Sequence, residues 1–131
     1  MASISRLAER FHLPNNPSSQ DWEVEVADFA RVDDFLEAYS DPLFSDDDRF
    51  LLMELIVASL DDGLRAGSQL GALWSRTRRL LLGSVRLHAA TLSYWACGND
   101  DDPEHQFAIT PLMRWVWRDV QADPALLSQP A

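Results

Sequence analysis

Residues 45–63 read SDDDRFLLMELIVASLDDG, and this segment predicts the central helix of the fold. Ser45 and the three acids behind it are typical of a helix start, because a serine side chain caps the first backbone amides and carboxylates favour the positive end of the helix dipole. Seven apolar side chains then follow in two helical stripes: Phe50, Met53, Val57 and Leu60, and Leu51, Leu55 and Ala58. Two stripes predict a central helix that is buried on two sides and ends near Asp62–Gly63 or Gly67.

The residues before this segment predict two further helices and one extended stretch. Apolar residues at helical spacing in 3–13 predict a short helix, which the prolines in 14–17 stop. A longer helix is expected from Asp28, an N-cap, to Tyr39. In residues 22–26, by contrast, Trp, Val and Val alternate with two glutamates. This period of two predicts a short extended segment.

The residues after the central segment predict two more helices. Residues 69–97 contain no proline and keep a helical repeat, so we expect one long helix, with Gly83 leaving a bend or break open as the alternative. Gly98 is a typical C-terminal cap. Thr110–Pro111 places a cap and a first-turn proline in their preferred order and predicts the start of a last helix.

Length and pattern together predict an all-α fold. A chain of 131 residues is near the commonest size for a single domain. We therefore expect a single-domain helical bundle over 1–131, made of about four main helices. A short N-terminal arm helix with its linker would occupy 1–20, and a loose tail would occupy 122–131.

The distribution of apolar residues argues against membrane insertion and export. The longest apolar run, residues 50–60, is shorter than the ~18 residues of a membrane span and is interrupted by Glu54. Charged residues also interrupt the N-terminal segment, which therefore lacks the hydrophobic centre of a secretion signal. A lone cysteine, Cys97, cannot form an intramolecular disulfide, which fits a reducing compartment. We expect a cytoplasmic protein with no membrane contact.

The net charge of −10 disfavours nucleic-acid binding, which requires an excess of positive charge. Fifteen of the acids lie in residues 1–63, against four arginines, and the chain has no lysine. This imbalance predicts another protein, of basic character, as the partner. The candidate partner-binding residues are five acids of the segment between Asp21 and Asp48: Asp33, Asp34, Asp46, Asp47 and Asp48.

One segment has the opposite charge. Residues 64–97 carry five arginines and no acid. On one continuous helix, Arg76, Arg79 and Arg86 would lie within roughly 80° of one another, away from the apolar stripe. They predict a patch for an anion or an acidic partner; the alternative is that they pair with the many carboxylates of the chain.

We expect neither a metal nor a cofactor. Asp46–Asp48 and Asp100–Asp102 lack the alternating ligands and the interior glycine of a calcium loop. The sequence also contains no phosphate-binding loop, dinucleotide fingerprint, nucleophile elbow, HExxH or paired CxxC motif.

Two polar pairs are the only enzymatic candidates. Glu54 lies in the most hydrophobic segment, and His88 lies on the expected core face of the long helix, so they would form a buried acid/base pair. The alternative is a structural histidine and a glutamate at the edge of the core. Cys97 and His105 could act as nucleophile and base, but no local signature supports that pair.

Several segments together give the chain its general character: the acidic stretch 20–48, LMELIVASLDDG at 52–63, Tyr94–Trp95, and FAITPLMR at 107–114. In these features it resembles small helical bacterial proteins and is similar to acidic immunity proteins. The resemblance implies a non-enzymatic inhibitor that binds a basic toxin, and it implies no particular site residue. The alternatives are a small hydrolase or metal-dependent enzyme using Glu54 and His88, and a structural homodimer that buries 22–26 or the last helix.

Overall fold

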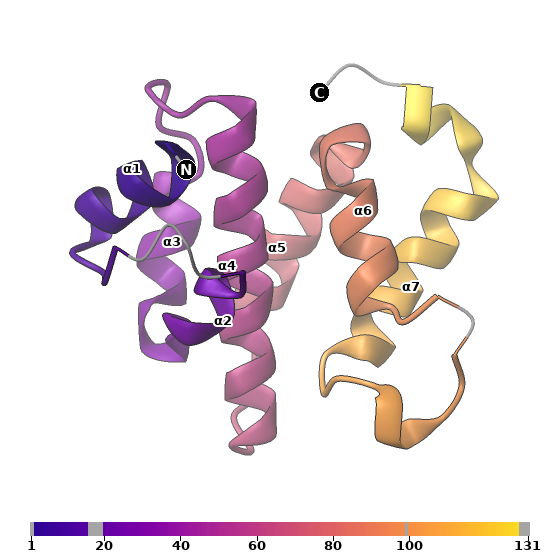
Figure 1. The fold of residues 1–131 in the computed structure, drawn as a ribbon. Coiled ribbons are helices and arrows are strands. Elements are labelled where there is room, and N and C mark those ends of the chain that lie inside the picture. Colours follow the sequence, from indigo (N-terminus) through magenta and orange to yellow (C-terminus); the bar gives the residue numbers. More distant parts are fainter. Residues whose placement is uncertain (1, 16–19, 99, 129–131) are drawn as a thin grey trace. The chain divides into compact units, whose positions relative to one another are not determined.

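The computed structural model describes residues 2–15, 20–98 and 100–128. Over these ranges it contains seven α-helices, three short 3-10 helices and no strand, so the predicted all-α fold is confirmed (Figure 1). The chain divides into two compact units, Met1–Asp62 and Gly63–Ala131, which we call unit 1 and unit 2. None of the helices in the described ranges combines the length and the apolar character that crossing a membrane requires.

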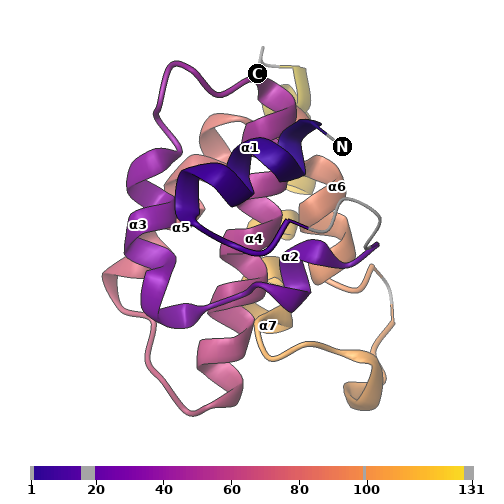
Figure 2. The same ribbon diagram turned by 60° about the vertical axis from the view of Figure 1, so that its left-hand side comes forward.

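Unit 1 is built from the helices α1 (Ala2–Phe11), α2 (Trp22–Glu25) and α3 (Val32–Ala38), which follows the 3-10 turn η1 (Phe29–Arg31), and from most of α4 (Asp46–Arg65). Figure 2 shows α3 and α4 running in opposite directions. The rings of Phe11 in α1 and Phe35 in α3 pack edge to face at 4.9 Å, and both side chains are buried. The predicted arm helix is therefore part of the core of unit 1.

The predicted start of the central helix is confirmed in detail. The Oγ atom of Ser45 accepts a hydrogen bond from the amide of Asp48 at 3.2 Å, and the amide of Ser45 donates to the Asp48 carboxylate at 3.0 Å. This reciprocal pair satisfies amides at the helix start that have no partner inside the helix. The two predicted stripes are also observed in large part, since nine of the ten residues from Leu52 to Asp61 are buried and the tenth, Glu54, is half-exposed.

The extended segment predicted for 22–26 is wrong: Trp22–Glu25 is one turn of α-helix. The described residues contain no strand that could pair with this segment, whereas a helical turn satisfies its backbone locally. The amides of Glu25 and Val26 donate to the carbonyls of Asp21 and Trp22, each at 3.0 Å. Trp22 is 1 % exposed, and its indole N–H donates to the carbonyl of Pro14 at 2.7 Å.

Unit 2 contains α5 (Ala72–Gly83), α6 (Val85–Trp95), the 3-10 turn η2 (Pro103–His105), α7 (Thr110–Ala122) and the 3-10 turn η3 (Pro124–Ser128). The helix α6 packs against α7, and α5 contacts both. The turn η3 also contacts α6 and α7, so 124–128 is not the loose tail that was expected; 129–131 lie outside the described residues.

The single long helix expected over 69–97 is wrong, and the alternative break near Gly83 is what the structure contains. Ser84 has φ −145° and ψ 56°, outside the helical region, and separates α5 from α6. Its carbonyl then accepts the amide of His88 at 3.1 Å, which starts the next helix. Glycine has a low helix propensity, so ending the helix at Gly83 costs little stability.

Candidate functional site

Four of the five predicted acidic residues are exposed, but they do not form one cluster. Asp33 and Asp34 lie in the first turn of α3, and Asp46 and Asp47 lie in the first turn of α4. The chain passes along α3 before it reaches the loop that leads into α4 (Figure 1). The two pairs are therefore separated by a helix of seven residues, which is about 10 Å long.

Asp48 is buried, so its assignment to an exposed partner surface is wrong. The residue is 1 % exposed, and its carboxylate accepts hydrogen bonds from Ser3 Oγ at 2.7 Å and from Arg6 Nε at 2.8 Å. Burial alone would raise the pKa of Asp48, but the hydrogen bonds from Arg6, the Ser45 amide and Ser3 lower it to about 2. Asp48 thus ties α1 to the start of α4.

All four arginines of unit 1 make contacts within the unit. Arg6 binds Asp48, and Arg49 lies 3.2 Å from the Asp46 carboxylate. Arg31 donates to the carbonyl of Phe11 at 2.7 Å and lies over the rings of Phe11 and Phe35. Arg10 is 3.8 Å from Asp41 and lies over Phe11. Since unit 1 has fifteen carboxylates and four arginines, its net charge is −11, and nine of these acids are exposed.

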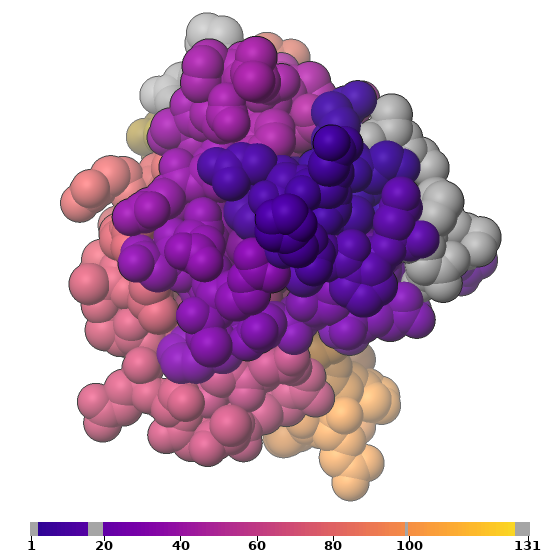
Figure 3. All heavy atoms as spheres, turned by 90° about the vertical axis from the view of Figure 1, so that its left-hand side faces the viewer, coloured from indigo at the N-terminus to yellow at the C-terminus, as the bar shows by residue number. Residues whose placement is uncertain are grey.

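The side of α3 that faces solvent carries three of these acids. Asp33, Asp34 and Glu37 are all exposed, and we call them the α3 acidic face. The opposite side of the same helix is buried through Val32, Phe35, Leu36 and Ala38. Figure 3 shows atoms of α1 and α3 side by side on the surface of unit 1.

The crowding of acids in unit 1 also affects Glu23, on α2. Burial raises the pKa of Glu23, and the nearby carboxylates of Glu54, Asp21 and Glu25 raise it further. Glu54 is half-exposed on α4 and therefore belongs to this acidic group. His88 is fully buried on α6 of unit 2. The two members of the predicted acid/base pair belong to different units, and their pairing stays a prediction.

The three predicted arginines do not share one continuous helix. Arg76, half-buried, and Arg79, exposed, lie on α5, whereas Arg86, exposed, lies on α6 beyond the break at Ser84. The angular calculation that grouped them therefore fails for Arg86. Arg79 instead borders a hollow of about 460 Å³ on α5, and this hollow is lined by Trp74, Ser75, Arg78, Arg79, Leu82 and Gly83. Arg78, which also lines this hollow, lies 3.2 Å from the Asp119 carboxylate of α7.

The Cys97–His105 pair does not have the geometry of a nucleophile and its base. The thiol of Cys97 lies 3.6 Å from the backbone carbonyl of His105 and 3.5 Å from the Thr110 hydroxyl. The His105 ring instead faces Asp100, with Nδ1 2.7 Å from the carboxylate oxygen. The described contacts of the ring are thus with acids of the loop and not with the thiol.

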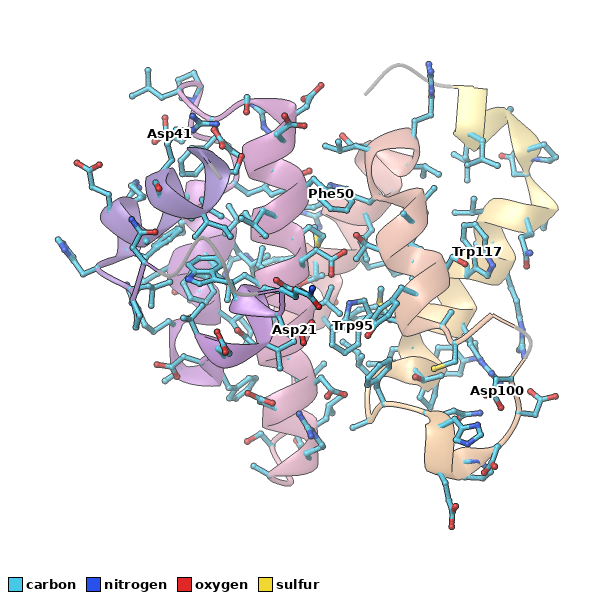
Figure 4. The ribbon with its side chains drawn as sticks, viewed as in Figure 1. Asp21, Asp41, Phe50, Trp95, Asp100 and Trp117 are labelled. Carbon is cyan, nitrogen blue, oxygen red and sulfur yellow. The ribbon has the colours of Figure 1, made fainter. Side chains whose placement is uncertain are left out.

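Sequence reasoning missed a second exposed feature, on α7. Arg114 donates to the carbonyl of Ala96 at 2.8 Å and to Asp101 at 3.0 Å, and so holds the α6–α7 loop (Figure 4 labels Asp100 in this loop and Trp117 on α7). Trp115 is 64 % exposed, and Arg114 and Arg118 both line two shallow hollows. The signal was available, because Trp115 and Arg118 are three residues apart and therefore on one helix face.

Within the described ranges, no group of three or more histidine, cysteine or acidic side chains is arranged to hold a metal ion. No family model, curated protein or solved structure matches the chain. The assignment of function therefore depends on the surfaces described above.

Proposed function

We propose that the protein is a non-enzymatic binding module whose acidic unit 1 recognises a basic protein. The observation that carries this proposal is the charge of unit 1. The unit contains fifteen carboxylates and only four arginines, and all four arginines make internal contacts. Carboxylates in such excess over the arginines of the unit attract a partner of opposite charge and raise its association rate.

Within unit 1, we assign recognition to the α3 acidic face. Its three carboxylates are exposed on a helix whose other side is buried, so their positions are fixed before binding. A preorganised surface loses little conformational entropy when a partner binds. The class of function that fits is an immunity-type or inhibitor-type protein of the bacterial cytoplasm, which neutralises a basic toxin by covering it.

The test is to isolate the partner from cells of the host and to measure its association rate with two matched variants. Asp33→Asn/Asp34→Asn removes two charges from α3, and Asp46→Asn/Asp47→Asn removes two from the start of α4. Asparagine remains compatible with a helix start, and melting curves confirm that both variants are folded. We expect the α3 variant to slow association several-fold at low salt, with little change in dissociation, and the α4 variant to have a smaller effect.

Two results would contradict the proposal. One is an unchanged association rate for the folded α3 variant at low salt. The other is a captured partner with an acidic surface, because an acidic partner would be repelled by unit 1.

A further inference from the structure

The hollow on α5 combines positive charge with an apolar lining. Arg78 and Arg79 border it, while Trp74 and Leu82 supply apolar surface. Arg79 is exposed and forms no ion pair with any described residue, whereas Arg78 is partly neutralised by Asp119. The stretch 64–97 around the hollow has five arginines and no acid. Arginine beside tryptophan is a common composition for protein-binding surfaces.

The charge of the hollow selects a ligand with carboxylates. A guanidinium group binds a carboxylate through two parallel N–H donors, and a short acidic helix presents several such groups. Nucleic acid also carries anions, but the net charge of −10 on the whole chain opposes a polyanion that extends over many residues. The ligand is therefore a compact acidic element.

We propose that this element is the α3 acidic face of a second copy of the chain, so that copies associate head to tail through unlike surfaces. Each chain carries both surfaces: three exposed carboxylates on α3 in unit 1, and an arginine-lined hollow on α5 in unit 2. From Asp33 to Glu37, a helix rises only about 6 Å, so the three carboxylates fit against one hollow. The proposal does not depend on the proposed function, although a basic partner would compete for α3.

The negative charge of both copies does not prevent this association at physiological salt. Charges are screened over about 8 Å, so the surfaces in contact determine the interaction more than the total charge does. Exposed ion pairs stabilise by only ~1 kcal/mol or less each, so the contact is weak and depends on concentration. In a head-to-tail dimer, one α3 acidic face and one α5 hollow remain unoccupied. Further copies can bind to these free surfaces, so longer assemblies form as the concentration rises.

The first experiment measures the average mass of the chain by light scattering over a range of concentrations. At about 0.15 M NaCl we expect the mass to rise above that of the monomer with concentration, and to return to it in about 1 M NaCl, where the Debye length is about 3 Å. Arg79→Glu should abolish the rise. Arg118→Glu is the matched control, because Arg118 is also exposed and forms no ion pair with the described residues, but lies on α7 outside this hollow.

The second experiment exchanges the charges. Asp34→Arg/Glu37→Arg should also abolish self-association, and an equal mixture of this variant with Arg79→Glu should associate again, because each variant keeps the unchanged surface that the other requires and the two reversed surfaces are also complementary. A chain that stays monomeric at every concentration would overturn the proposal, as would self-association that survives Arg79→Glu or high salt. Binding of the Arg79→Glu variant to the isolated basic partner tests the proposed function separately, because this variant keeps the α3 acidic face.

Discussion

Asp48 is a carboxylate that lies almost entirely out of solvent and is held by three donors, two from α1 and one from the loop before α4. Ser3, Arg6 and the Ser45 amide all bind it within 3.0 Å. Removing one member of a buried charged pair leaves the other without compensation, which is more costly than losing a surface pair. Its role is therefore to join α1 to α4, and its charge contributes to folding.

We predict that Asp48→Asn lowers the free energy of unfolding at pH 7 by about 2 kcal/mol, because the pKa falls from 3.8 to about 2 on folding and one pKa unit corresponds to ~1.4 kcal/mol. A lowered pKa stabilises the protein above the pKa of the unfolded chain, and this stabilisation is lost as the pH falls from about 4 to 2. Denaturation of both proteins at pH 7 and pH 3 measures the difference, which should shrink at pH 3. Asp47→Asn, an exposed neighbour, is the control; a difference that did not change with pH would contradict the prediction.

We also predict that His88 has a structural role. The residue is fully buried on α6, so His88→Ala removes packing inside the core and should destabilise the chain by about 1 to 3 kcal/mol. Urea denaturation measures the loss. If the variant kept full stability and lost a measured activity, an enzymatic role for His88 would replace this assignment.

At the scale of elements, the local signals in the sequence were sufficient at the start of the central helix. Ser45 caps α4. Gly98, with φ +53°, is left-handed but is not the cap of α6, which is Ala96, and Cys97, with φ +62°, is the first left-handed residue after that helix. The predictions failed where tertiary contacts determine the local structure or the burial of a side chain. The alternation in 22–26 did not show that Trp22 would be buried as part of a helical turn, and the acidic run 46–48 did not show that Asp48 would be held by α1.

Two glycines beside these element boundaries give a paired prediction. Gly83 is the last residue of α5, and Gly98 follows α6 with a positive φ; a Cβ at either position meets no atom within 4 Å. Gly83→Ala should therefore stabilise the chain by about 0.5 kcal/mol, because alanine loses less entropy in a helix. Gly98→Ala should destabilise it by roughly 1 kcal/mol, because alanine is strained at positive φ. Chemical denaturation of both variants measures the sign, and the same sign for both would show that backbone conformation is not the cause.

At the level of the whole molecule, the two units differ strongly in net charge. Unit 1 has a net charge of −11, whereas unit 2, with seven arginines and six acids, has a net charge of +1. Each unit has its own buried side chains, for example Phe35 in unit 1 and Met113 in unit 2. Like charges repel within a folded unit and lower its stability, so the two units should respond differently to salt.

We predict that added salt stabilises unit 1 more than unit 2. Raising NaCl from about 0.01 M to about 0.15 M shortens the Debye length from roughly 30 Å to about 8 Å, which weakens repulsion between the acids of unit 1. Amide hydrogen exchange in dilute solution, where self-association is negligible, measures each helix separately. Protection of α1 and α3 should increase several-fold, whereas α6 and α7 should change little. Asp33→Asn/Asp34→Asn should reduce the salt effect on α3, because it removes two of the repelling charges. An equal response of all helices to salt would mean that the acids of unit 1 are too widely spaced to repel one another. The electrostatic basis of the proposed partner recognition would then be weakened as well.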